Sequence, residues 1–384
     1  MSSTVIYLDH AAATPLDERV FLAMQPYFSD CFYNPSASYR GGREARQALE
    51  TARETVAKVL GAKPQEVIFT AGATESVNLA IRGVMQGGGH AVIGATEHAA
   101  VRESVKAYPY TVARCDERGV VSVEMIEQAV RDDTVLISVT MADNELGTVQ
   151  PISDIARYVA TVRSARRASG NTTPLYLHSD GSQAATALDV TVSRVGVDML
   201  TLSAAKCYGP KQMGLLWVKS SVRLEPLIAG GGQERGLRSG TENVAAAVGF
   251  AQALQHAQAH RHGENERLST LRDILVQGLT ERVEGLVVDG HAKRHLPGHL
   301  HVHVPRLDAE RVVFQLDLQG VYAATGAACA ANKQTSSPTL EAIGMTSDQA
   351  NGSLRFTLGR LNNEEQIRAA LPLIAEAIKK ERAL

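Results

Sequence analysis

The sequence predicts an α/β protein in which a mostly parallel sheet flanked by helices is followed by a smaller α+β C-terminal domain. Three observations support this prediction. The chain has 384 residues, more than a single hydrophobic core usually organises. Between residues 66 and 218, short apolar runs alternate with amphipathic stretches, which is the pattern of strands joined by helices in a parallel sheet. After about residue 255 that alternation gives way to long helical patterns.

The expected strands of the large sheet are short and apolar, and helical stretches separate them. In chain order they are "EVIFT", "HAVIGA", "TVLISVT", "PLYLHSD", "DMLTLSA" and "GLLWV". Helical patterns then run from about Thr241 to His262 and from Glu264 to Val283, followed by strand-like "GLVVDG" and "HLHVHV" and a last helix from about Asn363 to Arg382. We therefore expect a large domain over residues 15–255, and a small domain over residues 256–384 joined by residues 1–14.

Composition excludes several classes of protein. The 39 Lys and Arg residues nearly balance the 41 Asp and Glu residues, so the net charge gives no general attraction to nucleic acid or to an anionic membrane. No apolar stretch reaches membrane-spanning length and the opening lacks a signal-peptide pattern, so we expect a cytoplasmic protein. The cysteines lack CxxC spacing, which favours reduced thiols over a disulfide framework or a zinc site. They are Cys31, Cys115, Cys207 and Cys329.

Chemically useful side chains follow three of the expected strands. "PLYLHSDGSQ" leaves its apolar run at Asp180 and Gln183, and "DMLTLSAAK" leaves its run at Ser203 and Lys206. "VIFTAGATES" reaches Thr74 through a Gly and Ala turn that opens a helix, where exposed backbone N–H groups favour an anion. Each residue alone is explained as well by a structural role, such as a surface amine or a helix cap. Together they predict a site at the carboxyl edge of the sheet.

An amine, a carboxylate and a helix N-terminus are the groups that pyridoxal phosphate requires. The amine forms a Schiff base with the aldehyde, the acid pairs with the pyridinium nitrogen, and the helix N-terminus binds the phosphate. A nucleotide site is less favoured, because "GGGHAVIG" and "GGGQERG" match neither GxGxxG nor GxxxxGK[ST].

At this point the sequence resembles the cysteine desulfurases of the class V aminotransferase group, within the fold type I pyridoxal phosphate enzymes. The resemblance covers nearly the whole chain and implies conversion of L-cysteine to L-alanine with transfer of the sulfur. Its motifs are "YLDHAAATP", "NPSASYRGGREAR", "FTAGATESVNLAI", "EHAAV", "DNELGTVQPI", "HSDGSQA", "LSAAKCYGPKQMG", "GGGQERGLRSGTENV", "GAACAA" and "LRFTLGR".

The resemblance also implies roles around the cofactor ring. Lys206 matches the Schiff-base lysine, and Asp180 matches the carboxylate that keeps the pyridine nitrogen protonated. Gln183 matches a hydrogen-bond partner of the phenolic oxygen. His98 matches the imidazole that stacks on the ring and exchanges protons with the substrate, a role that suits a group titrating near neutrality. A lone histidine is more often structural, and the motif match raises His98 above that expectation.

Other matched residues concern the phosphate and the substrate. Thr74 and Ser203 match phosphate ligands, and Thr241 matches a threonine that reaches the phosphate of the neighbouring subunit, which implies a homodimer. Asn144 and Arg355 match the residues that hold the substrate α-carboxylate, a bidentate task that suits a guanidinium group.

Cys329 distinguishes this chemistry from ordinary transamination. It lies in "ATGAACAANKQTSSP", and these small and polar residues favour a reactive thiol on a loop over a small buried hydrophobe. The resemblance implies that the Cys329 thiolate attacks the substrate sulfur and passes the resulting persulfide sulfur to an acceptor protein. Iron–sulfur cluster assembly, RNA thiolation and DNA phosphorothioation all remain open as its destination.

The sequence departs from the family pattern at several positions. Ala205 stands where the family usually has a histidine that assists the phosphate, and a lost hydrogen bond to a charged group predicts cofactor retention weaker by about tenfold or more. His10, Tyr39 and Asp143 replace the usual asparagine, histidine and asparagine, respectively.

"HLHVHV" places His299, His301 and His303 on one face of an expected strand. Three imidazoles can bind a metal, but no carboxylate or thiol is close in sequence. We therefore expect a solvated strand face and no metal.

Two alternatives to a cysteine desulfurase remain. One keeps the cofactor but acts on another substrate, as a selenocysteine lyase or another class V aminotransferase, although Cys329 argues against simple transamination. The other is a weakly catalytic family member that acts as a binding partner, for which Ala205 and the unusual loop around Cys329 are the only support.

Overall fold

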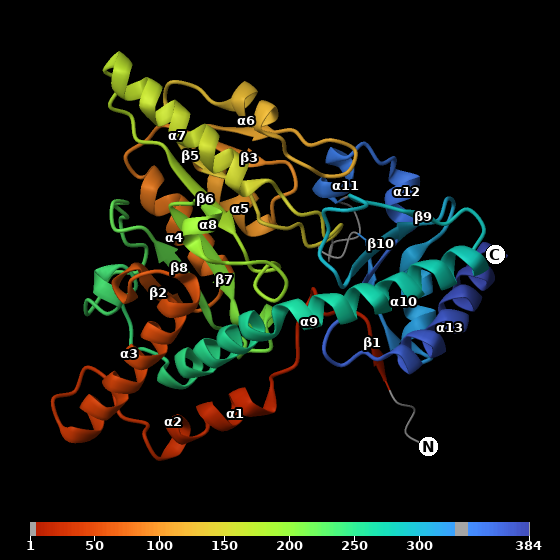
Figure 1. Cartoon of the computed structure of the whole chain (residues 1–384), viewed down its shortest axis with the longest axis horizontal. Helices are drawn as coiled ribbons and strands as arrows, with labels where there is room; N and C mark the ends of the chain where they lie inside the picture. Colours follow the sequence, from red (N-terminus) through yellow and green to blue (C-terminus); the bar gives the residue numbers. More distant parts are fainter. Residues whose placement is uncertain (1–4, 327–336, 384) are drawn as a thin grey trace.

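The computed structural model describes residues 5–326 and 337–383. Its two larger sheets lie next to each other, and one long helix, α9 (Val244–Arg282), extends from one to the other (Figure 1). The large sheet has the strand order β2-β8-β7-β6-β5-β3-β4. Its strands are β2 (Val67–Thr70), β3 (His90–Gly94), β4 (Tyr110–Ala113), β5 (Thr134–Ser138), β6 (Tyr176–Asp180), β7 (Met199–Ser203) and β8 (Gly214–Val218). Only β8 runs antiparallel to its neighbours, so the predicted mostly parallel sheet is confirmed.

Helices cover both faces of the large sheet, as a parallel sheet requires. One face packs on α3 (Arg40–Leu60), α6 (Val123–Ala129), α7 (Ile152–Ser169), α8 (Val192–Val195) and the first half of α9. The other face packs on α4 (Ala73–Met85) and α5 (Ala99–Val105). The short helices α1 (Glu18–Met24) and α2 (Pro26–Ser29) contact α9.

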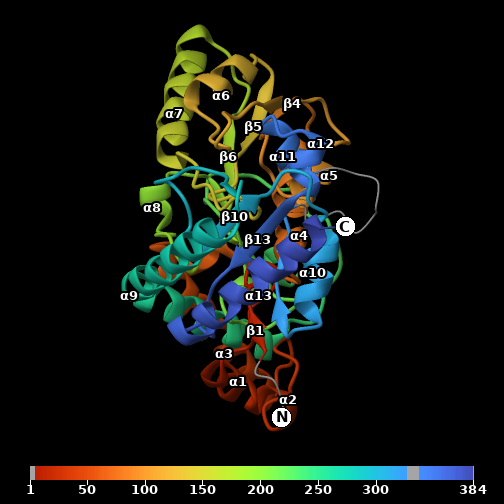
Figure 2. The same ribbon diagram turned by 90° about the vertical axis from the view of Figure 1, so that its right-hand side faces the viewer.

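The small sheet is antiparallel and has a core of its own. Its order is β12-β13-β10-β9, built from β9 (Val287–Val288), β10 (His299–His303), β12 (Ala324–Thr325) and β13 (Ser353–Thr357). Beside it, β1 (Ile6–Tyr7) pairs in parallel with β11 (Val321–Tyr322). Figure 2 shows α10 (Ala309–Asp317) and α13 (Glu364–Arg382) beside each other at this end of the molecule, where α11 (Pro338–Ala342) and α12 (Ser347–Asn351) also lie.

Helix α9 corrects one sequence expectation, because a single helix replaces the two that were expected around Gly263. Phe250 and Leu254 of α9 are buried in the large core, whereas Leu271 and Leu275 are buried in the small one. Gly263 lies on the exposed stretch between these contacts. The domain boundary near residue 255 falls within this helix and stays a prediction.

The register of the large sheet brings the ends of two strands to one edge. Gly214, the first residue of β8, pairs with Ser203 at the end of β7 and with Thr70 at the end of β2. The described part of the chain also contains three short 3₁₀ helices, η1 (Pro64–Glu66), η2 (Ala204–Lys206) and η3 (Glu234–Gly236). Among the described residues, no helix combines the length and apolar character needed to span a membrane.

Candidate active site

A cavity of about 1030 Å³ opens at the carboxyl edge of the large sheet, next to the small sheet. Residues from both sheets line it, including Ser203 of β7 and Arg355 of β13. The structure gathers eight of the predicted site residues around this space: Thr74, His98, Asn144, Asp180, Gln183, Ser203, Lys206 and Arg355. Their joint placement agrees with the expectation from the strand ends, and their individual roles stay proposals.

Lys206 follows β7 in the short helix η2, which turns the chain back towards β8. Its Nζ donates to the backbone oxygens of Ala11 (2.6 Å) and Ala12 (2.7 Å). Gln183 Nε2 donates to the same Ala11 oxygen at 3.1 Å. The segment that follows β1 therefore orients both side chains at the cavity.

The turn between β2 and α4 lines the cavity and leads into a helix start that can bind an anion. Gly72, the N-cap residue of α4, has φ 141° and provides no side-chain cap, so the first turn of the helix presents uncapped N–H groups. A Cβ on Gly214 would lie 2.5 Å from the Gly72 carbonyl carbon, so glycine is required where β8 meets this turn. The hydroxyl residues Thr74 and Ser203 line the same space.

Asp180 ends β6 and is buried, with 7% of its surface exposed. Its Oδ1 accepts a hydrogen bond from the backbone N–H of Ser182 at 2.9 Å. A buried carboxylate at this position can pair with a cationic ring nitrogen in the cavity.

His98 is the N-cap of α5, and its Nδ1 accepts from the backbone N–H of Ala100 at 3.1 Å. The side chain is exposed to the cavity, but the surrounding protein atoms exclude part of the solvent from around the ring. This desolvation lowers the pKa of His98 below 6.5, although Asp180 opposes the shift. Because Nδ1 is an acceptor, the neutral ring carries its proton on Nε2.

A buried polar chain beside Asp180 was not predicted from the sequence. Ser138 Oγ donates to Glu97 Oε1 at 3.3 Å and lies 2.9 Å from His178 Nδ1, while His178 Nε2 lies 3.0 Å from Thr201 Oγ1. Burial, and then the charge of Asp180, raises the pKa of Glu97 to about 8. Burial lowers the pKa of His178 to about 4. Glu97 and His178 are therefore both neutral at pH 7, so neither of them provides a positive charge for Asp180.

Arg355 joins the small sheet to the cavity and is only 3% exposed. One of its terminal nitrogens donates to Asp9 Oδ1 (2.8 Å) and the other to the Asn144 backbone oxygen (3.0 Å). Its Nε is buried without a hydrogen-bond partner among the described residues, so a carboxylate entering the cavity would satisfy a remaining donor. No sequence pattern predicted Asp9 as the partner of Arg355.

Two predicted residues remain, Thr241 and Cys329. Thr241 is exposed in the segment before α9 and is not among the residues lining the cavity. Cys329 lies outside the described residues. The described positions that flank it are anchored near Arg355: the Gly326 N–H donates to the Ser353 oxygen at 2.7 Å, and the Ser337 hydroxyl donates to Glu145.

The prediction that the three histidines of β10 lie on a solvated strand face is wrong. His301 and His303 are 1% and 5% exposed, because β9 and β13 flank the strand and Asp289 covers this side. Their Nδ1 atoms each lie 2.8 Å from an oxygen of Asp289. Burial lowers the pKa of His299 to about 3. Among residues 5–326 and 337–383, no cluster of three or more His, Cys, Asp or Glu is arranged to hold a metal.

The fold and cavity define a class V aminotransferase, and the family model "Aminotransferase class-V" matches residues 6–370. Cysteine desulfurase IscS of Dictyoglomus turgidum is 37% identical over 99% of this chain and 96% of its own. Cysteine desulfurase IscS 1 of Archaeoglobus fulgidus is 37% identical over 98% of both chains. The chain belongs to the aminotransferase class-V family and, within it, to the cysteine desulfurases, which are pyridoxal phosphate enzymes.

Solved structures agree with this assignment. A NifS-like protein, 32% identical, superposes with a TM-score of 0.89 and covers 98% of this chain and 100% of its own. SspA in complex with cysteine is also 32% identical, has a TM-score of 0.79, and covers 92% of this chain and 99% of its own. The predictions of fold, family and cofactor are therefore confirmed.

The residues present in the cavity fit pyridoxal phosphate. The cavity supplies an amine on Lys206, a buried carboxylate on Asp180 and an uncapped helix N-terminus at Gly72. These are the partners that the aldehyde, the ring nitrogen and the phosphate require. Ala205 lines the same space and, unlike the histidine usual in the family, contributes no side-chain donor.

Proposed function

We propose that this desulfurase converts L-cysteine to L-alanine and transfers the sulfur through a persulfide on Cys329 to an acceptor protein. We further propose that it works as a homodimer with shared sites. The observation that carries the proposal is the single cavity in which Lys206, Asp180, His98 and Arg355 meet. The solved relative in complex with cysteine supports the choice of substrate. Unpaired thiols on Cys31, Cys115 and Cys207 support a reducing compartment such as the cytoplasm.

Pyridoxal phosphate, when bound, supplies an electron-accepting ring that stabilises negative charge at the substrate α-carbon. Asp180 would hold the proton on the ring nitrogen, and the first turn of α4 with Thr74 and Ser203 would bind the phosphate. Lys206 would hold the cofactor by its aldehyde, and its Nζ would accept the α-proton of the substrate. Neutral His98 would exchange a proton with the substrate through Nε2, since its Nδ1 is occupied by the Ala100 N–H.

Arg355 would orient the substrate by its α-carboxylate. Its contacts with Asp9 and Asn144 fix the guanidinium plane, so little side-chain entropy remains to be lost on binding. Asn144, whose backbone oxygen accepts from Arg355, would add a side-chain donor beside it.

Cys329 would act as the nucleophile towards the substrate sulfur. Its thiolate forms an S–S bond as the substrate Cβ–S bond breaks, and the electron pair of that bond passes to the substrate carbon, which is then protonated to give alanine. The persulfide remains on Cys329 for transfer to a thiol of the acceptor protein.

The deciding experiment measures alanine and sulfide released from L-cysteine by the purified protein with added pyridoxal phosphate and a thiol reductant. Equal amounts of both products are expected, and Cys329→Ala should abolish their release while leaving cofactor binding intact. Cys115→Ala is a matched control, because burial raises the pKa of that thiol to about 11 and it stays protonated. Full activity in Cys329→Ala would remove the proposed nucleophile, and a monomer in sedimentation would exclude shared sites.

A further inference from the structure

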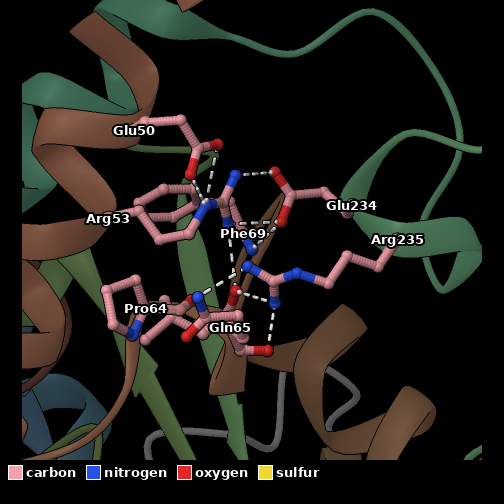
Figure 3. Close-up of polar contacts among 8 residues, drawn as sticks. Glu50, Arg53, Pro64, Gln65, Phe69, Glu234 and Arg235 are labelled. Atoms are coloured by element: carbon pink, nitrogen blue, oxygen red, sulfur yellow. Dashed lines mark hydrogen bonds and ion pairs between the residues drawn. The ribbon is translucent and has the colours of Figure 1, made fainter. Parts of the chain in front are cut away.

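The segment that carries Thr241 is fastened to the edge of the large sheet by a buried ion pair. We call residues 228–242 the arm. Within it, Glu234 receives both terminal nitrogens of Arg53 from α3, each at 2.8 Å. The two side chains are only 4% and 3% exposed. Figure 3 shows this pair meeting above Phe69, whose ring lies 4.9 Å from the Arg53 guanidinium carbon.

The same two side chains complete the outer edge of β2. Glu234 Oε2 accepts from the Phe69 N–H at 2.9 Å, and Arg53 donates to the Val67 oxygen at 2.9 Å. Arg235 adds bonds to the oxygens of Pro64 (2.9 Å) and Gln65. The arm therefore occupies hydrogen-bonding positions that a further strand would use.

The backbone of the arm is strained where it makes these contacts. Glu234 and Arg235 have φ values of 46° and 59°, in the left-handed backbone region that residues other than glycine rarely adopt. Two consecutive residues hold this conformation only if the surroundings enforce it, and such strain often accompanies functional sites. The Arg53–Glu234 pair provides that enforcement.

Beyond the ion pair, the arm contacts the first turn of α4 and ends in residues that do not line the cavity of its own subunit. Arg238 donates to Glu75, in the first turn of α4, at 2.9 Å. Three residues later Thr241 is exposed and absent from the cavity lining. Next to it, the buried Oε2 of Glu242 has no hydrogen-bond partner within the described part of the chain. The end of the arm thus shows features of a surface completed by another molecule.

We propose that Arg53 and Glu234 are positioning residues that hold the arm so that Thr241 reaches the cofactor phosphate of the partner subunit. This inference rests on the proposed homodimer with shared sites. Its specific content is that the ion pair in one subunit governs cofactor retention in the other. A pair that only stabilised β2 and α4 would act on the cavity of its own subunit.

The first test is Glu234→Gln, which keeps the shape of the side chain but removes its charge. The cofactor dissociation rate, followed by the absorbance of the lysine-bound cofactor during dilution, should rise at least about tenfold, as for one lost hydrogen bond to a charged group. Asp198→Asn is the matched control, because Asp198 is 5% exposed and pairs with Arg163 on an element unconnected with the arm. It should leave cofactor dissociation unchanged.

Mixed dimers, purified with two affinity tags, then separate action within a subunit from action across the dimer. In a dimer of Glu234→Gln and Lys206→Ala subunits, the only site with a lysine lies in the Glu234→Gln subunit and receives an intact arm. Wild-type retention is expected there. In a dimer of a wild-type subunit and a subunit with both substitutions, the only lysine site receives the altered arm, and fast dissociation is expected.

The reverse pattern, with fast dissociation following the subunit that contains Glu234→Gln, would overturn the inference, as would wild-type retention in the Glu234→Gln homodimer. If Glu234→Gln gives no folded protein, Arg53→Lys, which keeps the charge but loses the bidentate contact, is used in the same pairings with the same expectations. The wild-type protein shows whether the proposed function itself fails, because in that case it would bind no cofactor or would remain monomeric.

Discussion

Glu97 shows how burial controls charge next to the candidate site. The residue is 3% exposed, and its Oε2 has no hydrogen-bond partner among the described residues. A second negative charge near Asp180 is avoided because burial keeps Glu97 protonated. Glu97 therefore adds no second negative charge beside Asp180 at pH 7. The family resemblance pointed to the neighbouring His98, whereas no sequence signal pointed to Glu97, since glutamate is rarely fully buried.

The titration of Glu97 makes the stability of the fold depend on pH. Its pKa is about 8 in the folded protein and near 4.5 when unperturbed, so between these values the folded state holds an extra proton. Stability should fall as pH rises through this window, by up to about 1.4 kcal/mol per pH unit from this group. Glu97→Gln should remove that slope in urea unfolding followed by Trp217 fluorescence. The exposed Glu103→Gln should keep it, and an unchanged slope in Glu97→Gln would contradict the assignment.

Ala205 tests the phosphate-binding part of the cavity at a single position. Its backbone oxygen accepts a hydrogen bond from the Thr14 hydroxyl at 3.1 Å. Its side chain is a methyl group at the position where the family usually has a histidine that assists the phosphate. Ala205→His should add one charge-assisted hydrogen bond and tighten cofactor binding by about tenfold or more. Titration of the apo protein measures the change. Ala205→Ser offers a shorter donor and should have a smaller effect, whereas equal affinity in all three proteins would contradict the prediction.

At the scale of elements, the close contact between β8 and the turn before α4 determines the shape of the turn that we propose binds the cofactor phosphate. A Cβ on Gly214 would lie 2.5 Å from Gly72 C and 2.9 Å from Ala73 N. Gly214→Ala should displace this turn, costing about 1–3 kcal/mol of stability and weakening cofactor binding by about tenfold. Calorimetry and cofactor titration measure these two effects. Gly94→Ala at the end of β3 meets nothing closer than 3.6 Å and should be tolerated; equal behaviour of the two variants would contradict the prediction.

Individual strands and contacts differ in how far they could be predicted from the sequence. The central strands were predictable because each contains a short apolar run, and the residues at their ends defined the edge where the candidate site lies. β4 was missed because it is a partly exposed edge strand, with Tyr110 and Val112 open to solvent. The Arg355–Asp9 contact spans 346 positions, so no local pattern could reveal it. Individual roles within the site came from the family resemblance.

At the scale of the whole molecule, α9 links two cores that contribute different parts of the candidate site. Lys206 follows a strand of the large sheet, whereas Arg355 lies on the small sheet. The apolar face of α9 changes direction between Leu254 and Leu268, because each half packs on a different core. This change interrupts the regular apolar stripe, which is why the sequence suggested two helices instead of one.

Continuity of α9 at Gly263 should therefore control how the two halves of the site are aligned. Gly263 is exposed and nothing lies within 4 Å of a Cβ placed there, so Gly263→Ala should raise stability by about 0.5–1 kcal/mol without changing activity. Gly263→Pro removes a helical hydrogen bond and kinks the helix, at a cost of about 3 kcal/mol. Because the kink moves Arg355 relative to Lys206, KM for L-cysteine should rise more than kcat falls. A proline variant with lowered thermal stability but wild-type KM would show that direct contacts between the two sheets, and not α9, hold Arg355 in place.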